Sequence, residues 1–124
     1  MDRPLAGRSI LIVEDEPIIA MDIALVFEKA GAQVTTTTTL RHATILVEND
    51  GLSAAVLDHG LGDGDSASLR ERLTERNIPF VIYSGFGPID DGARHEAPHV
   101  SKPAHPEMLV ATIAELLGRE QTSN

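Results

Sequence analysis

The chain of 124 residues is long enough for one domain with a single core, and its 42% hydrophobic and 23% charged content is ordinary for a globular protein. Its net charge of −9 disfavours non-specific nucleic-acid binding, and its 3% aromatic content leaves little for stacking on bases or sugars. Cysteine is absent, which excludes disulfides and thiolate metal sites. No apolar run approaches the length of a membrane span, so we expect a cytoplasmic protein that does not bind a membrane, and the charge predicts that it does not bind nucleic acid.

Strand and helix patterns alternate along the chain. Short apolar or β-branched runs predict strands, and longer segments with apolar residues at helical spacing predict helices. In chain order the prediction is strand Ser9–Val13, helix Pro17–Ala30, strand Gln33–Thr37, helix Leu40–Asn49, strand Ser53–Leu57, helix Ser66–Asn77, strand Pro79–Tyr83, strand His99–Ser101 and helix Pro106–Leu117.

Several of these elements carry signals at their ends. Gly31 follows the first helix as a stop signal, and the five threonines of 35–39 end the second strand and cap the next helix. Pro106 suits the first turn of the last helix, and Gly118 stands after it. Residues 85–98 are rich in Gly, Pro and Asp, so they predict no firm helix.

The helical spacing also indicates which residues form apolar faces. In the third helix, Leu69 and Leu73 are predicted to be buried. Phe80 and Tyr83 of the fourth strand are interpreted as packing residues rather than functional ones. The first helix has apolar residues at helical spacing, and the pattern leaves open whether they belong to the core or to a contact surface. These residues are Ile18, Met21, Leu25 and Val26.

Strands that alternate with helices predict βαβ units and a parallel sheet covered on both faces. We expect an N-terminal extension over 1–8, one domain over 9–118 and a disordered tail over 119–124. In such sheets ligands bind beyond the carboxyl ends of the strands, where the strand order reverses. The positions that directly follow a predicted strand are Glu14–Asp15, Asp58, Ser84 and Lys102.

These positions combine acids, a hydroxyl and an amine. Glu14, Asp15 and Asp58 in one crevice would repel one another, and a divalent cation would relieve this. Hard oxygen ligands favour Mg²⁺, with Mn²⁺ as an alternative. A metal-bound Asp58 could also attack phosphorus and become an acyl phosphate. Lys102 could then hold one phosphate oxygen, and the Ser84 hydroxyl could donate to another.

Four stretches, ILIVEDEP, AAVLDHGLGDG, FVIYSG and HVSKP, resemble the motifs of response-regulator receiver domains of two-component signalling. The resemblance runs from about Ser9 to Gly118. It implies a three-layer, doubly wound (βα)5 flavodoxin-like fold with a five-stranded parallel sheet. The SGFG start of the segment between the fourth and fifth strands is similar to stand-alone alphaproteobacterial receivers. In that group the helix of this segment is reduced, so we expect it to be short or irregular here.

The resemblance also implies roles for the residues around the acceptor. Asp58 would be the phosphoacceptor and would contact the metal. Asp15 would bind Mg²⁺ directly, and Glu14 would do so mostly through water. Gly60 would lend its backbone carbonyl to the metal, and glycines in that loop allow the backbone to approach closely.

Further roles fall on the last two strands. Ser84 would be the switch hydroxyl, and Gly85 after it would leave access to the phosphate. Lys102 would bind the phosphate, and the peptide bond between Lys102 and Pro103 is a candidate for the cis form. His99 stands where the family often has an aromatic switch residue, so the resemblance does not imply signal transmission by rotation of an aromatic ring, and His99 is a candidate phosphate-binding or switch residue.

Each of these residues also has a plainer interpretation. Glu14 and Asp15 could cap the first helix, and Asp58 could be a turn acid before a Gly-rich loop. Lys102 could be a solvated lysine, and His99 an ordinary polar surface residue. Their occurrence together, in order, favours the receiver interpretation for the acids and Lys102, whereas for His99 the surface interpretation is favoured.

The resemblance implies that a sensor histidine kinase or a histidine phosphotransfer protein phosphorylates this chain. We expect no enzyme activity beyond its own phosphorylation and dephosphorylation. The output would be phosphorylation-dependent partner binding by a monomer or weak homodimer, a phosphorelay shuttle or a phosphate sink. The alternative is a receiver-like interaction module that is never phosphorylated. A magnesium-dependent phosphatase similar to haloacid dehalogenases is disfavoured, because Gly60 stands where its general acid would be.

Overall fold

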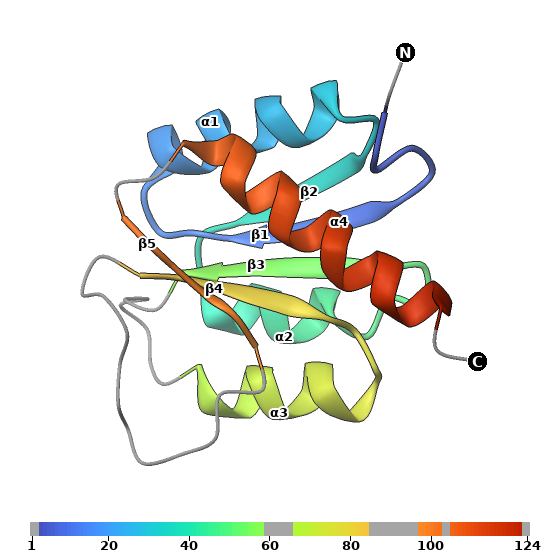
Figure 1. Ribbon diagram of the computed structural model, residues 1–124. Helices are drawn as coiled ribbons and strands as arrows, with labels where there is room; N and C mark the ends of the chain where they lie inside the picture. The colour runs from blue at the N-terminus through green and yellow to red at the C-terminus, as the bar shows by residue number, and fades with distance from the viewer. Residues whose placement is uncertain (1–2, 59–65, 85–96, 103–104, 123–124) are drawn as a thin grey trace.

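Five parallel strands form one sheet in the computed structural model, which describes residues 3–58, 66–84, 97–102 and 105–122 (Figure 1). The strand order is β2-β1-β3-β4-β5, and every neighbouring pair is parallel. The chain therefore moves outward from β1 to β2 and then crosses to build the rest of the sheet on the other side of β1. This is the predicted doubly wound α/β fold, and its order reverses between β1 and β3.

The elements lie within a few residues of the predicted ones. Two strands end one residue later than expected, so that Asp58 and Ser84 are the last residues of their strands. A helix between β4 and β5 was expected to be short or irregular, and residues 85–96 lie outside the described part of the chain. The elements are β1 (Ser9–Val13), α1 (Pro17–Lys29), β2 (Gln33–Thr37), α2 (Leu40–Leu46), β3 (Ala54–Asp58), α3 (Ala67–Glu75), β4 (Phe80–Ser84), β5 (His99–Ser101) and α4 (Pro106–Thr122).

The helix α4 is longer than the sequence predicted. It starts at Pro106 as expected, but it passes through Gly118 and ends at Thr122, so residues 119–122 of the expected disordered tail are helical. A glycine ends a helix when it adopts a left-handed conformation, and Gly118 does not do so. Glycine inside a helix costs only about 1 kcal/mol relative to alanine, which a helix of this length tolerates.

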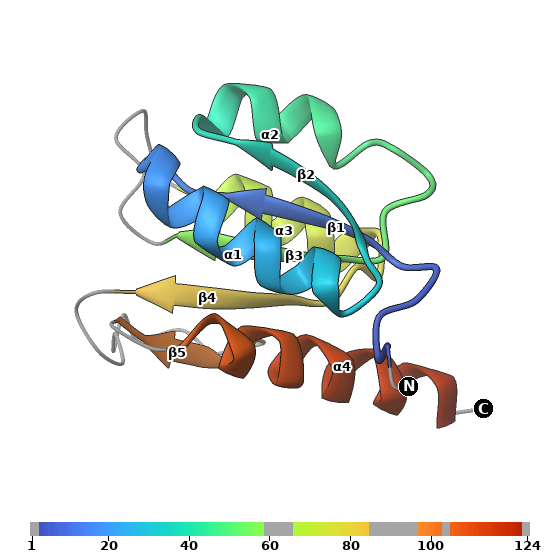
Figure 2. The same cartoon turned by 90° about the horizontal axis from the view of Figure 1, so that it is seen from above.

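Helices cover both faces of the sheet (Figures 1 and 2). The face under α1 and α4 packs Ile10 and Ile12 of β1 against Phe27 and Ile113. The opposite face packs the alternate strand residues under α2 and α3, where Leu69 and Leu73 are buried as predicted. Because both faces are covered, β1 and β3 are buried along almost their whole length, and their side chains can reach solvent only at the strand ends.

The structure decides which side of α1 is buried, a question that its apolar spacing left open. This helix is apolar around most of its circumference, so spacing alone identifies two candidate faces. The residues buried against the sheet are Ala20, Ile23 and Phe27. Three residues of the other stripe are exposed: Ile18 at 76%, Met21 at 61% and Leu25 at 50%. These three residues, called the α1 stripe below, are therefore a surface feature.

The turn after α1 brings the N-terminal segment onto the domain. Gly31 ends the helix with φ of +101°, which agrees with its predicted role as a stop signal. A Cβ atom at Gly31 would lie 2.9 Å from the Cα of Ala6. The Leu5 amide donates to the Ala30 carbonyl at 2.9 Å, and the Leu5 side chain is fully buried. The segment expected as an extension thus contributes to the core.

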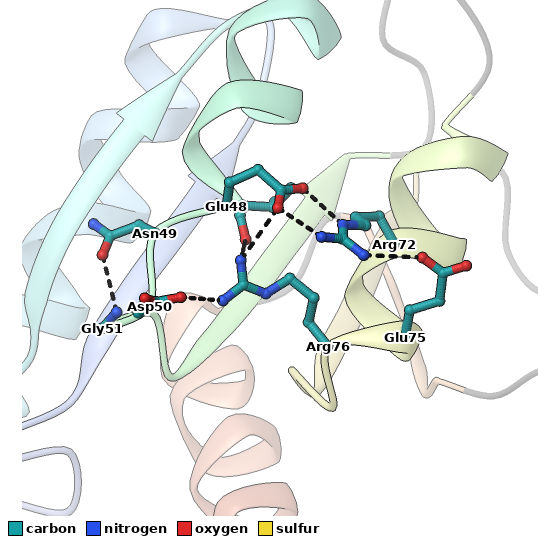
Figure 3. Close-up of polar contacts among 8 residues, drawn as sticks. Glu48, Asn49, Asp50, Gly51, Arg72, Glu75 and Arg76 are labelled. Atoms are coloured by element: carbon teal, nitrogen blue, oxygen red, sulfur yellow. Dashed lines mark hydrogen bonds and ion pairs between the residues drawn. The ribbon is translucent and has the colours of Figure 1, made fainter.

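Ion pairs connect the end of α2 to α3 on the surface (Figure 3). Glu48 accepts two hydrogen bonds of 2.7 Å from Arg72, and Arg76 donates to Asp50 at 2.7 Å and to the Val47 carbonyl at 3.2 Å. The hydrogen bond from Arg72, aided by the charges of both arginines, lowers the pKa of Glu48 despite partial desolvation. This network holds together the two helices that cover one face of the sheet.

Candidate functional site

The acids of the site lie at the carboxyl ends of β1 and β3, the two neighbouring strands between which the strand order reverses. Val13 and Leu57 are register partners, so the next residues, Glu14 and Asp58, lie side by side. The Glu14 amide still donates to the Thr37 carbonyl at 3.0 Å, which keeps this residue in line with its strand. The chain then turns away through Asp15 toward α1. The fold therefore brings the three predicted acids to one edge.

Two of these acids are buried. Glu14 is 1% exposed and Asp58 is 5% exposed, whereas Asp15 is exposed. One carboxylate oxygen of each acid lies within 4.8 Å of one oxygen of each of the others. Burying two acids beside a third is unfavourable unless cations compensate their charge. Positive charges bound at this edge of the sheet are therefore needed to stabilise the three acids.

One compensating charge is Lys102, which follows β5. Its Nζ atom donates to Asp58 Oδ1 at 3.1 Å and lies 3.2 Å from Glu14 Oε1. Burial works to lower the pKa of Lys102, but the hydrogen bond and the charge of Asp58 outweigh it, so the pKa is raised and the ammonium stays protonated. The lysine thus reaches the two buried acids from the far edge of the sheet.

The Glu14 carboxylate is only partly satisfied by the protein. Its Oε2 atom accepts a hydrogen bond from the Glu16 amide at 3.2 Å, while Oε1 has the ion pair with Lys102 but accepts no hydrogen bond of good geometry from the residues that the structure describes. Desolvation, and then the charge of Asp58, raise the pKa of Glu14 from 4.5 to about 7, although the Glu16 hydrogen bond and Lys102 oppose this. One lysine therefore does not balance the acids.

This donor set fits a hard divalent cation. Three carboxylates from adjacent positions offer oxygen ligands, and Glu14 has a buried oxygen that accepts no hydrogen bond among the described residues. Mg²⁺ prefers oxygen ligands and few direct protein contacts, with water completing its shell. The helix-capping alternative for Glu14 and Asp15 receives little support, because the N-cap residue of α1 is Glu16, without a side-chain hydrogen bond.

Sequence reasoning missed Tyr83 as part of this site. Tyr83 is 6% exposed and packs in the core as predicted, but its ring also faces Lys102, whose Nζ lies 5.2 Å from the ring centroid. Tyr83 is the register partner of Asp58 on the neighbouring strand. The sequence did contain a signal that could have identified Tyr83 as a site residue. It is an aromatic residue directly before Ser84, at the carboxyl end of the strand predicted next to the one that ends at Asp58.

The remaining predicted residues lie as follows. Ser84 is the last residue of β4 and pairs in register with Ser101. His99 begins β5 and pairs with Ile82, whose side chain belongs to the core under α2 and α3, so His99 lies on the face opposite to Tyr83. The structure therefore does not bring His99 into the group around Asp58. Gly60, Gly85 and Pro103 lie outside the described residues.

The chain belongs to the response regulator receiver domain family, whose model matches residues 10–114. This family supplies the phosphoacceptor domains of two-component signalling. Its members generally accept a phosphoryl group on an aspartate from histidine kinases or phosphotransfer proteins, and they generally bind Mg²⁺ at an acidic pocket. In the described part of the chain, no helix has the length and apolar character needed to cross a bilayer.

Similar proteins include regulators longer than this chain and receivers of about its length. The chain is 32% identical over 86 residues to the photosynthetic apparatus regulatory protein RegA of Rhodobacter capsulatus, a match that covers 68% of this chain and 47% of that protein. The chain is also 30% identical to the response regulator PhyR from Brucella abortus, with a TM-score of 0.82. This match covers 98% of this chain and 53% of the PhyR chain. The chain thus spans about half the length of these two relatives.

A further solved structure supports the fold alone. A CheY-like receiver domain protein from Methanospirillum hungatei is 22% identical, with a TM-score of 0.83, and the match covers 96% of this chain and 100% of that one.

Proposed function

We propose that this chain is a phosphoacceptor that takes a phosphoryl group onto Asp58 in a Mg²⁺-dependent reaction. The observation that carries the proposal is the convergence of Lys102, Glu14 and Asp58 at the end of β3, with Asp15 beside them. A buried aspartate at a strand end, held at 3.1 Å by a lysine from another strand, has the surroundings that an acyl phosphate needs.

In the proposed reaction, a carboxylate oxygen of Asp58 attacks the phosphorus of a phosphohistidine. A P–O bond forms as the P–N bond breaks, and the electron pair passes to the imidazole nitrogen, which takes up a proton from solvent. Lys102 then moves its hydrogen bond from Asp58 Oδ1 to an oxygen of the transferred group. Because Lys102 stays protonated beside these acids, it can neutralise part of the charge that gathers there.

The role of the acids is to hold Mg²⁺. Glu14, Asp15 and Asp58 are the side chains that would bind it, and the Gly60 carbonyl is a further proposed ligand outside the described residues. When bound, Mg²⁺ neutralises charge on the phosphoryl oxygens and so lowers the barrier to their approach to Asp58. We propose Mn²⁺ as a substitute, since it prefers the same oxygen ligands.

The α1 stripe is the proposed docking surface for the phosphodonor. It consists of Ile18, Met21 and Leu25, and α1 begins two residues after Asp15, so the stripe starts next to the site. An amphipathic helix that carries the phosphohistidine could pack its apolar side chains on this stripe while the histidine reaches Asp58. The partner is thus a histidine kinase or a histidine phosphotransfer protein, and its encounter with this chain takes place in the cytoplasm.

The proposal assigns the chain no other enzymatic activity. Its output is binding to a partner that distinguishes the phosphorylated form, with a phosphorelay shuttle or phosphate sink as the two other ways to use the same chemistry. Ser84 is the proposed switch hydroxyl, because it ends the strand next to Asp58. Phosphorylation would shift an equilibrium between two conformations.

The experiment is incubation with acetyl phosphate and Mg²⁺, followed by intact-mass analysis. We expect the wild-type chain to gain the mass of one phosphoryl group in an adduct that is stable in acid and labile in base. Asp58→Asn should abolish the adduct. Asp22→Asn, an exposed aspartate on α1, is the matched control and should retain it. An adduct that survives Asp58→Asn would refute Asp58 as the acceptor, and no adduct on the wild type would favour the unphosphorylated interaction module.

The docking surface is tested separately with a phosphorylated donor protein. Ile18→Ser should slow transfer from the donor protein and leave modification by acetyl phosphate unchanged. Ile45→Ser is the matched control, because Ile45 is 66% exposed but lies on α2, on the other face of the sheet. Equal effects of the two serine variants would contradict the assignment of the stripe.

A further inference from the structure

Lys102 has to cross a strand to reach the acids it contacts. It follows β5, the edge strand of the sheet, while Asp58 ends β3 and Glu14 follows β1. The strand β4 lies between β5 and β3. The lysine side chain must therefore pass over the end of β4 before its Nζ can bond to Asp58 at 3.1 Å and approach Glu14 at 3.2 Å.

The side chain of β4 at the crossing point is Tyr83. It pairs in register with Asp58 on one side and with Val100 on the other. Residues paired in a parallel sheet share a face, so Tyr83 lies on the same face as Asp58, and Lys102, two residues after Val100, continues that face. The Lys102 Nζ atom lies over the Tyr83 ring, 5.2 Å from its centroid.

We propose that Tyr83 is a positioning residue for the phosphate-binding lysine: its ring face carries the Lys102 ammonium across β4 and holds it at Asp58. This proposal deepens the proposed function and rests on it for the role of Lys102. The negative face of an aromatic ring attracts an ammonium group, and the attraction is stronger where water is excluded. Tyr83 is 6% exposed and the Lys102 side chain 21%, so the contact is largely shielded from water.

The aromatic ring attracts the Lys102 ammonium, which an aliphatic side chain at residue 83 would not do. Lysine is a flexible four-carbon chain with many rotamers, and a solvated alternative is open to it at the edge of the sheet. A favourable contact midway along its path raises the fraction of molecules in which Nζ lies at Asp58. A leucine at residue 83 would fill apolar space without attracting the charge, whereas a phenylalanine would keep the ring.

The composition of the chain makes the contact directly measurable by NMR. The sequence contains one tyrosine, Tyr83, and two lysines, Lys29 and Lys102. Lys29 is exposed near the end of α1 and serves as an internal reference. In carbon–proton correlation spectra of the full chain, we expect the Lys102 ε-methylene protons upfield of those of Lys29 through the ring current. The shift should persist in Tyr83→Phe and collapse toward Lys29 in Tyr83→Leu.

The functional measurement is the rate of Asp58 modification by acetyl phosphate at saturating Mg²⁺. Tyr83→Leu should be about threefold to tenfold slower, and Tyr83→Phe should stay within about twofold of the wild type. If Tyr83 only filled space in the core, the rate would not be retained in Tyr83→Phe while both the rate and the Lys102 chemical shift change in Tyr83→Leu. If Tyr83→Leu does not fold, Tyr83→Met takes its place, since methionine fills irregular apolar space.

Several results would overturn the proposal. Lys102 protons that coincide with those of Lys29 in the wild type would show that the ring does not hold the lysine. An unchanged rate in Tyr83→Leu would show that the contact does not position it. Equal loss in the Phe and Leu variants would assign the effect to the hydroxyl. If wild-type Asp58 is never modified, the proposed function fails, and the NMR comparison still decides whether Tyr83 holds Lys102.

Discussion

Replacing Glu14 by glutamine removes one buried charge from the site while keeping the size of the side chain. In the folded chain the pKa of Glu14 is raised from 4.5 to about 7, chiefly by desolvation and then by the charge of Asp58. The folded state therefore binds this proton more tightly than the unfolded state. The resulting stabilisation is fully present below pH 4.5 and is lost as the pH rises through about 7.

This pKa difference sets the size of the effect. It corresponds to about 3 kcal/mol over the whole range, of which about 2 kcal/mol is lost between about pH 5.5 and about pH 7.5. We expect the advantage of the wild type over Glu14→Gln in the free energy of unfolding to shrink by that amount between these two pH values. The assay is urea unfolding in buffer with a metal chelator.

A control and a metal titration complete this experiment. Glu28→Gln, at the exposed far end of α1, measures the effect of a glutamate-to-glutamine change away from the site. Saturating Mg²⁺ should reduce the loss at the higher pH, because the ion favours the ionised carboxylate. A difference between wild type and Glu14→Gln that stays constant with pH, or that grows as the pH rises, would refute the reasoning.

Three further changes test other parts of the structure. Mg²⁺ should raise the unfolding midpoint of the wild type as its concentration exceeds the Kd, and Asp15→Ala should remove most of this rise in thermal unfolding; an unchanged rise would contradict the ligand assignment. Gly31→Ala should lower the free energy of unfolding in urea by about 1 to 3 kcal/mol, because Gly31 has a φ of +101° and an added Cβ would lie 2.9 Å from Ala6. Gly118→Ala is the control and should be neutral or stabilising, because Gly118 lies within α4 and an added Cβ would meet open space. Arg76→Ala should lower the free energy of unfolding by about 1 kcal/mol, because it removes the half-buried hydrogen bond to the Val47 carbonyl. Arg72→Ala removes only exposed ion pairs and should lower it by less.

Local sequence signals predicted most of the fold. Strands β1 and β3 are continuous apolar runs, which only a sheet covered on both faces can bury. Helix α2 begins where Thr39 accepts a hydrogen bond from the His42 amide, and α4 begins at Pro106; each signal acts within one turn of chain. Errors occurred where a signal is permissive, as at Gly118, since glycine allows a helix to end but does not force it.

The sequence by itself determined the order of elements, the identity of the acids and the lysine, and the receiver family, because strand ends and motifs are local properties of the chain. Only the tertiary structure decided which side of α1 is buried, that Glu14 is buried with its Oε1 atom beside Lys102, and that Lys102 crosses β4 over the Tyr83 ring. These three features depend on which strands are neighbours and which face each helix covers. Neither is a property of any single stretch of sequence, since each arises when distant segments pack together.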